Sequence, residues 1–115
     1  MITLFANQKG GVGKSTLALL FANYLSLTQN KEVIVFDMDN QRSIYNKAQA
    51  AKVLENEPLY EVEVAELEQF KIIFDLVRGK ENLITIIDIA GTIENNDLLP
   101  IFKCADLVIC PFAYD

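Results

Sequence analysis

Nine consecutive residues near the N-terminus combine the residue types that a phosphate-binding loop requires. They are Gln8-Lys9-Gly10-Gly11-Val12-Gly13-Lys14-Ser15-Thr16. Glycines let the backbone curl closely around an anion, so successive N–H groups can point inward, and a helix starting here adds its partial positive charge. Lys14 supplies a full positive charge, and the hydroxyl of Ser15 is the oxygen ligand that a phosphate-bound Mg²⁺ needs in such loops. The stretch therefore predicts a nucleotide-phosphate site.

The motif departs from the common P-loop pattern at its first position. The pattern G-x-x-x-x-G-K-[ST] requires glycine where this chain has Gln8, and a second lysine, Lys9, follows. The resulting K-G-G-x-G-K-[ST] form resembles the deviant Walker A loop of the ParA/MinD family of ATPases. The resemblance implies that residues 9–16 bind ATP, that Lys14 contacts the phosphates in its own subunit, and that Lys9 reaches those of the partner subunit. A glycine-rich turn with two solvated lysines is the alternative, which the strand before it and the helix after it disfavour.

Three aspartates follow apolar runs of the kind found in buried parallel strands. Asp37 and Asp39 come after residues 33–36, and Asp88 comes after residues 83–87. Ligands of open α/β sheets bind beyond the carboxyl ends of the strands, so we expect these side chains beside the phosphate loop. An apolar run followed by aspartate is also the Walker B arrangement, in which the carboxylate holds the Mg²⁺ shell, often through water.

The stretch Asp37-Met38-Asp39-Asn40-Gln41 resembles the D-x-D-P-Q motif of the same family, with Asn40 in place of proline. By that resemblance Asp37 belongs to the outer shell around Mg²⁺, and Asp39 orients the water that attacks the γ-phosphate. The expected metal set is Ser15, Asp37 and Asp88, and the expected catalytic residues are Lys9, Lys14 and Asp39. A second reading makes the stretch a capping loop for the next helix, with Ser43 as the N-cap, and both roles can hold together.

Hydrophobic periodicity divides the chain into alternating strands and helices. Strands are predicted at residues 2–6, 33–36, 83–88 and 105–111, with a half-exposed edge strand at 59–64. Helices are predicted at 16–27, 43–56 and 65–78, followed by a short one that ends at Cys104. The expected buried face of the first helix is Leu17, Leu20, Phe21, Tyr24 and Leu25. Gly79 is expected to cap the third helix.

This alternation predicts an α/β fold, a P-loop NTPase domain with a mostly parallel sheet flanked by helices. With 115 residues, 51% of them hydrophobic, the chain can bury the core of one domain. The resemblance covers only the N-terminal half of the family's domain. Residues 1–115 are therefore expected to be the N-terminal part of a single ParA-like domain, truncated after the fifth strand and leaving an apolar sheet edge.

Composition excludes several functional classes. The net charge of -6 argues against a protein that coats nucleic acid through its overall field. The chain has no histidine, which removes His-based triads and imidazole metal sites. Cys104 and Cys110 are too far apart to bridge each other if a strand lies between them, and they fit a reducing compartment. No signal peptide or membrane-length apolar run is present in the sequence, so a cytoplasmic location is expected.

The resemblance implies a ParA-like ATPase that binds Mg²⁺ and ATP and uses slow hydrolysis as a dimerisation switch in plasmid, chromosome or mobile-element partitioning. Its implied partners are a second copy of the chain and a DNA-bound adaptor protein, with non-specific DNA contacts made by residues absent from this chain. Alternatives are a MinD-like ATPase that acts at the membrane and a non-hydrolysing module that binds nucleotide or a partner. An iron-sulfur reductase is a further alternative, and Cys104 and Cys110 are badly placed for it.

Overall fold

The computed structural model describes residues 1–7, 14–39, 42–53, 60–90 and 96–110. These residues form a five-stranded sheet in the order β3-β2-β4-β1-β5, and each pair of neighbouring strands is parallel. The strands are β1 (Ile2–Asn7), β2 (Glu32–Asp37), β3 (Glu61–Val64), β4 (Leu83–Ala90) and β5 (Leu107–Ile109). The helices are α1 (Lys14–Leu27), α2 (Ser43–Val53), α3 (Phe70–Val77) and α4 (Leu99–Cys104), with 3-10 turns η1 (Leu67–Gln69) and η2 (Asn96–Leu98). The predicted α/β fold is confirmed.

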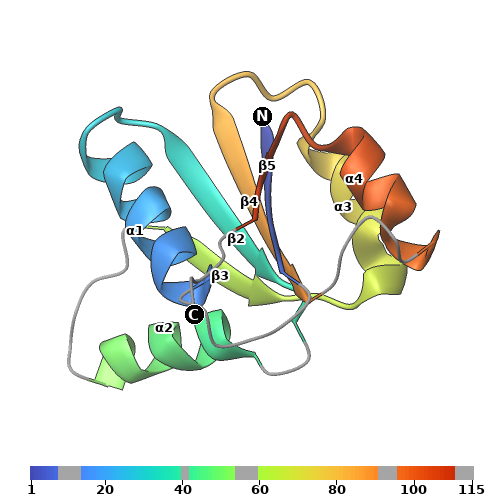
Figure 1. Cartoon of the computed structure of the whole chain (residues 1–115). Helices are drawn as coiled ribbons and strands as arrows, with labels where there is room; N and C mark the ends of the chain where they lie inside the picture. The colour runs from blue at the N-terminus through green and yellow to red at the C-terminus, as the bar shows by residue number, and fades with distance from the viewer. Residues whose placement is uncertain (8–13, 40–41, 54–59, 91–95, 111–115) are drawn as a thin grey trace.

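The helices cover the sheet on both faces (Figure 1), with α1 and α2 on one face and α3 and α4 on the other. Side chains from alternate positions of the strands form one core under each pair of helices. The interior strand β1 contributes to both, because Leu4 and Phe5 are each 0% exposed and point to opposite faces. Each such side chain contributes about 1.5–3 kcal/mol when fully buried.

The buried face of α1 differs from the prediction. Ala18, Ala22 and Leu25 face the sheet, with Phe21 packed at the margin. Leu17, Leu20 and Tyr24 are exposed instead. Apolar residues surround this helix on most sides, so periodicity alone did not identify the buried face. The two alanines allow the helix to approach the sheet closely, and the larger side chains are left on the outside.

Helix α3 starts later than predicted, at Phe70 and not near residue 65. A capping box precedes it, in which the Glu66 carboxylate accepts the N–H of Gln69 and the Gln69 side chain accepts the N–H of Glu66 at 2.7 Å. This arrangement satisfies two backbone donors and starts the segment with the 3-10 turn η1. The predicted cap at the other end is confirmed, since Gly79 has φ +79°.

Both edges of the sheet agree with expectation. The edge strand predicted at 59–64 is β3, which pairs only with β2 in the described part of the chain. The last strand is shorter than predicted, because β5 spans only Leu107–Ile109. It is tied to β1 by Asp106, whose carboxylate accepts the N–H of Ile2 at 2.8 Å. Leu107 and Val108 are exposed, which gives the expected apolar edge.

No helix among the described residues has the length and apolar content needed to cross a membrane.

Candidate phosphate and metal site

Asp37 and Asp88 lie side by side at the carboxyl ends of β2 and β4. They are register partners in the parallel pairing of these strands, which places them about 4.8 Å apart across the sheet. The N–H of Met38 donates to the carbonyl of Asp88 at 2.9 Å and continues the ladder one step further. Asp88 is also the register partner of Phe5 on β1. Two of the three residues of the predicted metal set are therefore neighbours.

Both carboxylates are on the sheet face that α1 covers. Val33 and Val35 of β2 pack in the same core as Ala18 and Ala22 of α1, and Asp37 follows Val35 by two residues. Ile84 and Ile86 of β4 belong to the same core, and Asp88 follows Ile86 by two residues. Since side chains alternate along a strand, both aspartates point to this face. They are buried, each at 0% exposure.

The predicted phosphate loop connects the carboxyl end of β1 to the start of α1. Residues 8–13 lie outside the described residues, so the predictions for Lys9, Gly10, Gly11, Val12 and Gly13 concern a part that the structure does not describe. Its two flanking elements are those that a P-loop requires, because β1 ends at Asn7 and α1 begins at Lys14. The backbones of Lys14 and Ser15 form the first turn of α1, where N–H groups and the helix dipole favour an anion. That turn contains no acidic residue.

Asp37 also has a structural role. One carboxylate oxygen, Oδ1, accepts the N–H of Asp39 at 3.1 Å, and the other, Oδ2, accepts the N–H of Tyr45 at 2.9 Å. Tyr45 is the third residue of α2, so Asp37 acts as a helix cap from the tip of a neighbouring strand. The prediction of Ser43 as N-cap is corrected, because α2 begins at Ser43 itself.

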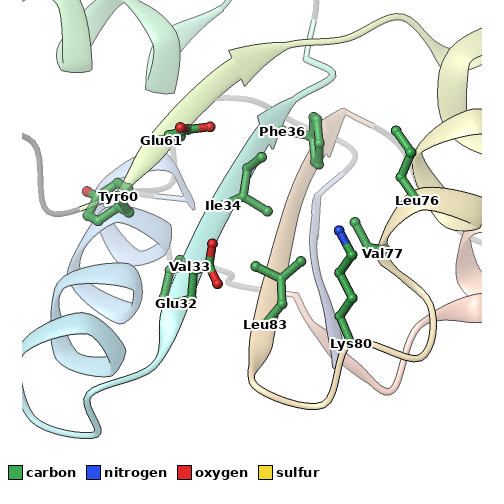
Figure 2. A pocket seen from close by; sticks show the side chains of 10 residues that line it. All are labelled: Glu32, Val33, Ile34, Phe36, Tyr60, Glu61, Leu76, Val77, Lys80 and Leu83. Carbon is green, nitrogen blue, oxygen red and sulfur yellow. The ribbon is translucent and has the colours of Figure 1, made fainter.

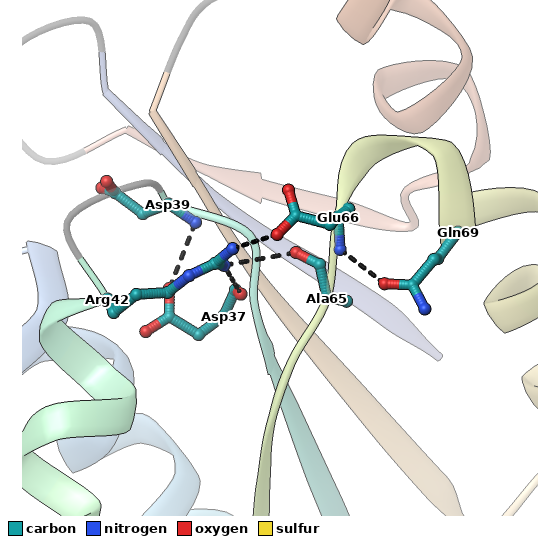
Figure 3. Close-up of polar contacts among 6 residues, drawn as sticks. All are labelled: Asp37, Asp39, Arg42, Ala65, Glu66 and Gln69. Atoms are coloured by element: carbon teal, nitrogen blue, oxygen red, sulfur yellow. Dashed lines mark hydrogen bonds and ion pairs between the residues drawn. The ribbon is translucent and has the colours of Figure 1, made fainter.

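Asp39 lies in the turn after β2 and is buried, at 5% exposure. Its backbone is held on both sides, since its N–H donates to Asp37 and its carbonyl accepts the N–H of Arg42 at 2.9 Å. Figure 3 shows its carboxylate directed away from the Arg42 side chain. Asp39 is thus a buried acid on a turn whose backbone is fixed next to Asp37.

Two basic residues near the site were missed by the sequence analysis. Lys47 of α2 donates from Nζ to the hydroxyl of Thr16 at 2.9 Å, so the predicted ligand-binding residue Thr16 contacts a cation from a second helix. Arg42 binds the backbone at the end of β2 (Figure 3). No motif marks either residue, although Arg42 is the first basic residue after the Asp37–Asp39 stretch.

A cavity of about 620 Å³ lies elsewhere on the molecule (Figure 2). Its lining includes Glu32, Glu61 and Leu83, which are the first residues of β2, β3 and β4. The cavity is therefore at the amino ends of the strands, opposite Asp37 and Asp88. Tyr60 also lines it, and partial burial raises the pKa of this phenol above its ordinary 10.0. This cavity is not part of the candidate phosphate site.

Within the described ranges no three or more His, Cys, Asp or Glu residues come together as a metal cluster. Cys104 and Cys110 are free thiols, so the expectation that they do not bridge each other is confirmed.

Several solved structures share this fold, including the following three. A plasmid partition protein from Borrelia burgdorferi matches with a TM-score of 0.70 and 23% identity over 99% of this chain and 66% of its own. A second Borrelia burgdorferi B31 protein, assigned to plasmid partition and bound to AMPPNP, has a TM-score of 0.63 and 26% identity over 96% of this chain and 61% of its own. The pNOB8 ParA structure bound to nonspecific DNA has a TM-score of 0.62 and 20% identity over 96% of this chain and 52% of its own.

The chain thus spans between about half and two thirds of the length of these proteins. No curated protein sequence matches it significantly. A sequence model of one family, the CobQ/CobB/MinD/ParA nucleotide binding domain, matches residues 3–100. That match covers most of the chain and includes the phosphate-loop motif and all three aspartates of the site. This chain belongs to the CobQ/CobB/MinD/ParA nucleotide-binding domain family.

Proposed function

We propose that the chain is the N-terminal part of a single ParA-like ATPase domain that binds Mg²⁺ and ATP and uses slow hydrolysis as a dimerisation switch in DNA partitioning. The observation that carries the proposal is the pairing of Asp37 and Asp88. These buried carboxylates lie on adjacent strand ends, on the sheet face that α1 covers, and α1 begins within the phosphate-loop motif, at Lys14. Plasmid, chromosome or mobile-element segregation is the proposed use, in the cytoplasm.

The residues present fit a Mg²⁺-nucleotide. Oxygen donors are the ligands that Mg²⁺ takes, and this ion is usually held by one or two carboxylates together with phosphates and water. Two neighbouring buried carboxylates repel each other, and a cation beside them would relieve that repulsion. The Ser15 hydroxyl, Asp37 and Asp88 are the proposed holders, with both aspartates acting in the outer shell. When bound, Mg²⁺ would neutralise charge on the phosphates.

The proposed roles of the remaining residues come from the motifs they belong to, and the fold supports those of Lys14 and Asp39. Lys14, the first residue of α1, adds its charge to the helix N-terminus and binds the phosphates of its own subunit. Lys9 reaches the phosphates of the second subunit. Asp39 accepts a hydrogen bond from the attacking water and orients it, and its fixed backbone limits the positions its carboxylate can take.

The proposed switch depends on the role that the motif assigns to Lys9, a residue outside the described ranges. Contacts that one subunit makes to the γ-phosphate of the other favour the dimer, and they are lost on hydrolysis, so the bound nucleotide biases a two-state equilibrium. The relatives support this use, since one is bound to AMPPNP and another, a ParA, is bound to nonspecific DNA. The proposed partners are a second copy, a DNA-bound adaptor, and DNA contacted through residues beyond this chain.

A non-hydrolysing binding module is a second candidate, which the exposed apolar edge at Leu107 and Val108 favours. ATP binding and turnover of the complete protein separate the two functions. We expect wild-type protein to hydrolyse ATP, Lys14→Ala to lose binding, and Asp39→Ala to bind ATP without turnover. Lys71→Ala and Asp75→Ala are matched controls, because both residues are exposed on α3. Failure of the wild-type protein to bind ATP would favour the module.

A further inference from the structure

Arg42 has a backbone conformation that its side chain does not favour. Its φ is 55°, in the left-handed region, where a residue with a β-carbon costs about 1–2 kcal/mol relative to the right-handed one. Such a conformation persists where surrounding contacts fix it. The side chain of Arg42 is only 22% exposed, and its contacts help to keep the backbone in this conformation.

The Arg42 guanidinium binds three acceptors on two adjacent strand ends (Figure 3). Its Nη1 donates to the carbonyl of Asp37 at 2.6 Å and to that of Ala65 at 3.3 Å, and its Nη2 pairs with Glu66 Oε1 at 2.5 Å. The N–H of Ala65 also donates to the Asp37 carbonyl, at 3.1 Å. Arg42 therefore closes the β2–β3 ladder where the chain turns toward Asp39.

The same turn is fixed from the opposite side by the Asp37 carboxylate. That carboxylate holds the N–H groups of Asp39 and Tyr45, while Arg42 holds the Asp37 carbonyl with its side chain and the Asp39 carbonyl with its N–H. The backbone of Asp39 is consequently bonded at both its N–H and its carbonyl. Loss of the Arg42 side chain would leave these backbone bonds in place but remove the link that joins the Asp37 carbonyl to Ala65 and Glu66.

Glu66, which pairs with Arg42, is itself held in place by the capping box at the start of η1. Its carboxylate accepts the Gln69 N–H in the capping box and also pairs with Arg42. Glu66 is 60% exposed, so the ion pair alone contributes little, and the charge-assisted bonds to the two carbonyls are the stronger contacts. A planar guanidinium can serve all three acceptors at once, whereas a lysine ammonium lacks this fork.

We propose that Arg42 is a positioning residue for Asp39. By joining the end of β2 to the segment after β3, it keeps the Asp37–Asp39 turn in the geometry that water orientation requires. This inference rests on the proposed ATPase function for its kinetic consequence, but its structural consequence can be measured without nucleotide.

The test compares Arg42→Gly and Arg42→Lys with wild type in the complete protein. Glycine accepts a positive φ, so Arg42→Gly removes the side chain without adding backbone strain. Asn30→Gly is the matched control, because Asn30 also has positive φ, at 53°, and lies after α1. Arg78→Ala controls for loss of an exposed arginine. For Arg42→Gly we expect kcat to fall about 10-fold or more with KM for ATP within about 2-fold, and Arg42→Lys to recover part of the loss.

Amide hydrogen exchange of the nucleotide-free protein gives the second readout. Arg42→Gly should speed exchange at Asp39 and Ala65 relative to wild type, and leave Ile87 in the middle of β4 unchanged. Unchanged exchange at Asp39 and Ala65, or a change in KM with kcat preserved, would overturn the proposal. If wild-type protein shows no ATP turnover but Arg42→Gly still speeds exchange at these amides, the proposed ATPase function fails and the positioning of the turn stands.

Discussion

Asp37 and Asp88 are register partners on neighbouring parallel strands, and both are completely buried on the face that α1 covers. Both carboxylate oxygens of Asp37 accept hydrogen bonds from backbone N–H groups of the following turn and helix. The two aspartates can therefore have different roles. Asp37 fixes the local structure, and in the proposed ATPase Asp88 would contribute the larger share of the charge that the metal requires.

If the two aspartates have these separate roles, substituting Asp37 should mainly change the stability of the fold, and substituting Asp88 should mainly change the Mg²⁺ dependence of ATP binding. Asp37→Ala leaves the N–H groups of Asp39 and Tyr45 without their acceptor, so we expect unfolding free energy to fall by about 1–3 kcal/mol. Urea unfolding of nucleotide-free protein measures it, with Asp75→Ala as a control at an exposed site. An unchanged urea midpoint for Asp37→Ala would show that these bonds contribute nothing.

Asp88→Asn removes one of the two neighbouring buried charges and keeps the side chain's shape. We expect the Mg²⁺ concentration needed for half-maximal ATP binding to increase about 10-fold or more, because a neutral amide does not balance the charge of the ion. A Mg²⁺ titration of ATP binding measures this shift. The same Mg²⁺ dependence in Asp88→Asn and wild type would remove Asp88 from the metal site.

The sequence predicted the neighbouring positions of Asp37 and Asp88 better than it predicted the helix packing around them. Asp37 and Asp88 could be placed together because each ends an apolar run, and parallel strands bring their carboxyl ends to one edge. The buried face of α1 could not be found in the same way, since a helix with apolar residues on most sides has several equally good stripes. Leu20 and Tyr24 were assigned to the core for that reason, and the structure exposes them.

The contacts of Arg42 were also beyond sequence reasoning. They depend on Ala65 and Glu66, which lie 23 and 24 residues further along the chain and come close only because β2 and β3 are paired. The capping of α2 by Asp37 has the same origin, because the cap comes from a strand tip eight residues before the N–H it binds. A local capping motif at Ser43 was the natural expectation from sequence, and the tertiary contact replaced it.

The close approach of α1 to the sheet predicts a steric effect at Ala22. This residue is 0% exposed, so Ala22→Leu would overpack the core and should lower the unfolding free energy by about 1–3 kcal/mol. Ala50→Leu makes the same change at an exposed position of α2 and should stay within about 0.5 kcal/mol of wild type. Urea unfolding of both variants tests the packing, and equal stability of the two would contradict it.

The partly buried phenol of Tyr60 leads us to expect that the unfolding free energy depends on pH above neutrality. Burial raises the pKa of its phenol, so the unfolded chain loses this proton at a lower pH than the folded one. The unfolded state then binds fewer protons, and unfolding free energy should fall as pH rises through and above 10.0. Tyr60→Phe removes this contribution, so its stability should fall less between pH 9 and 11 than that of wild type, as measured by urea unfolding at each pH. Parallel curves for the two proteins would contradict the assignment.

The most direct test of the account is calorimetric titration of the complete protein with ATP, with Mg²⁺ and with Mg²⁺ chelated. We expect binding by wild type that weakens strongly without Mg²⁺, no binding by Lys14→Ala, and wild-type binding by the control Lys71→Ala. Binding of ATP by Lys14→Ala as tightly as by wild type, or no binding by wild type with Mg²⁺ present, would contradict a nucleotide site at the start of α1.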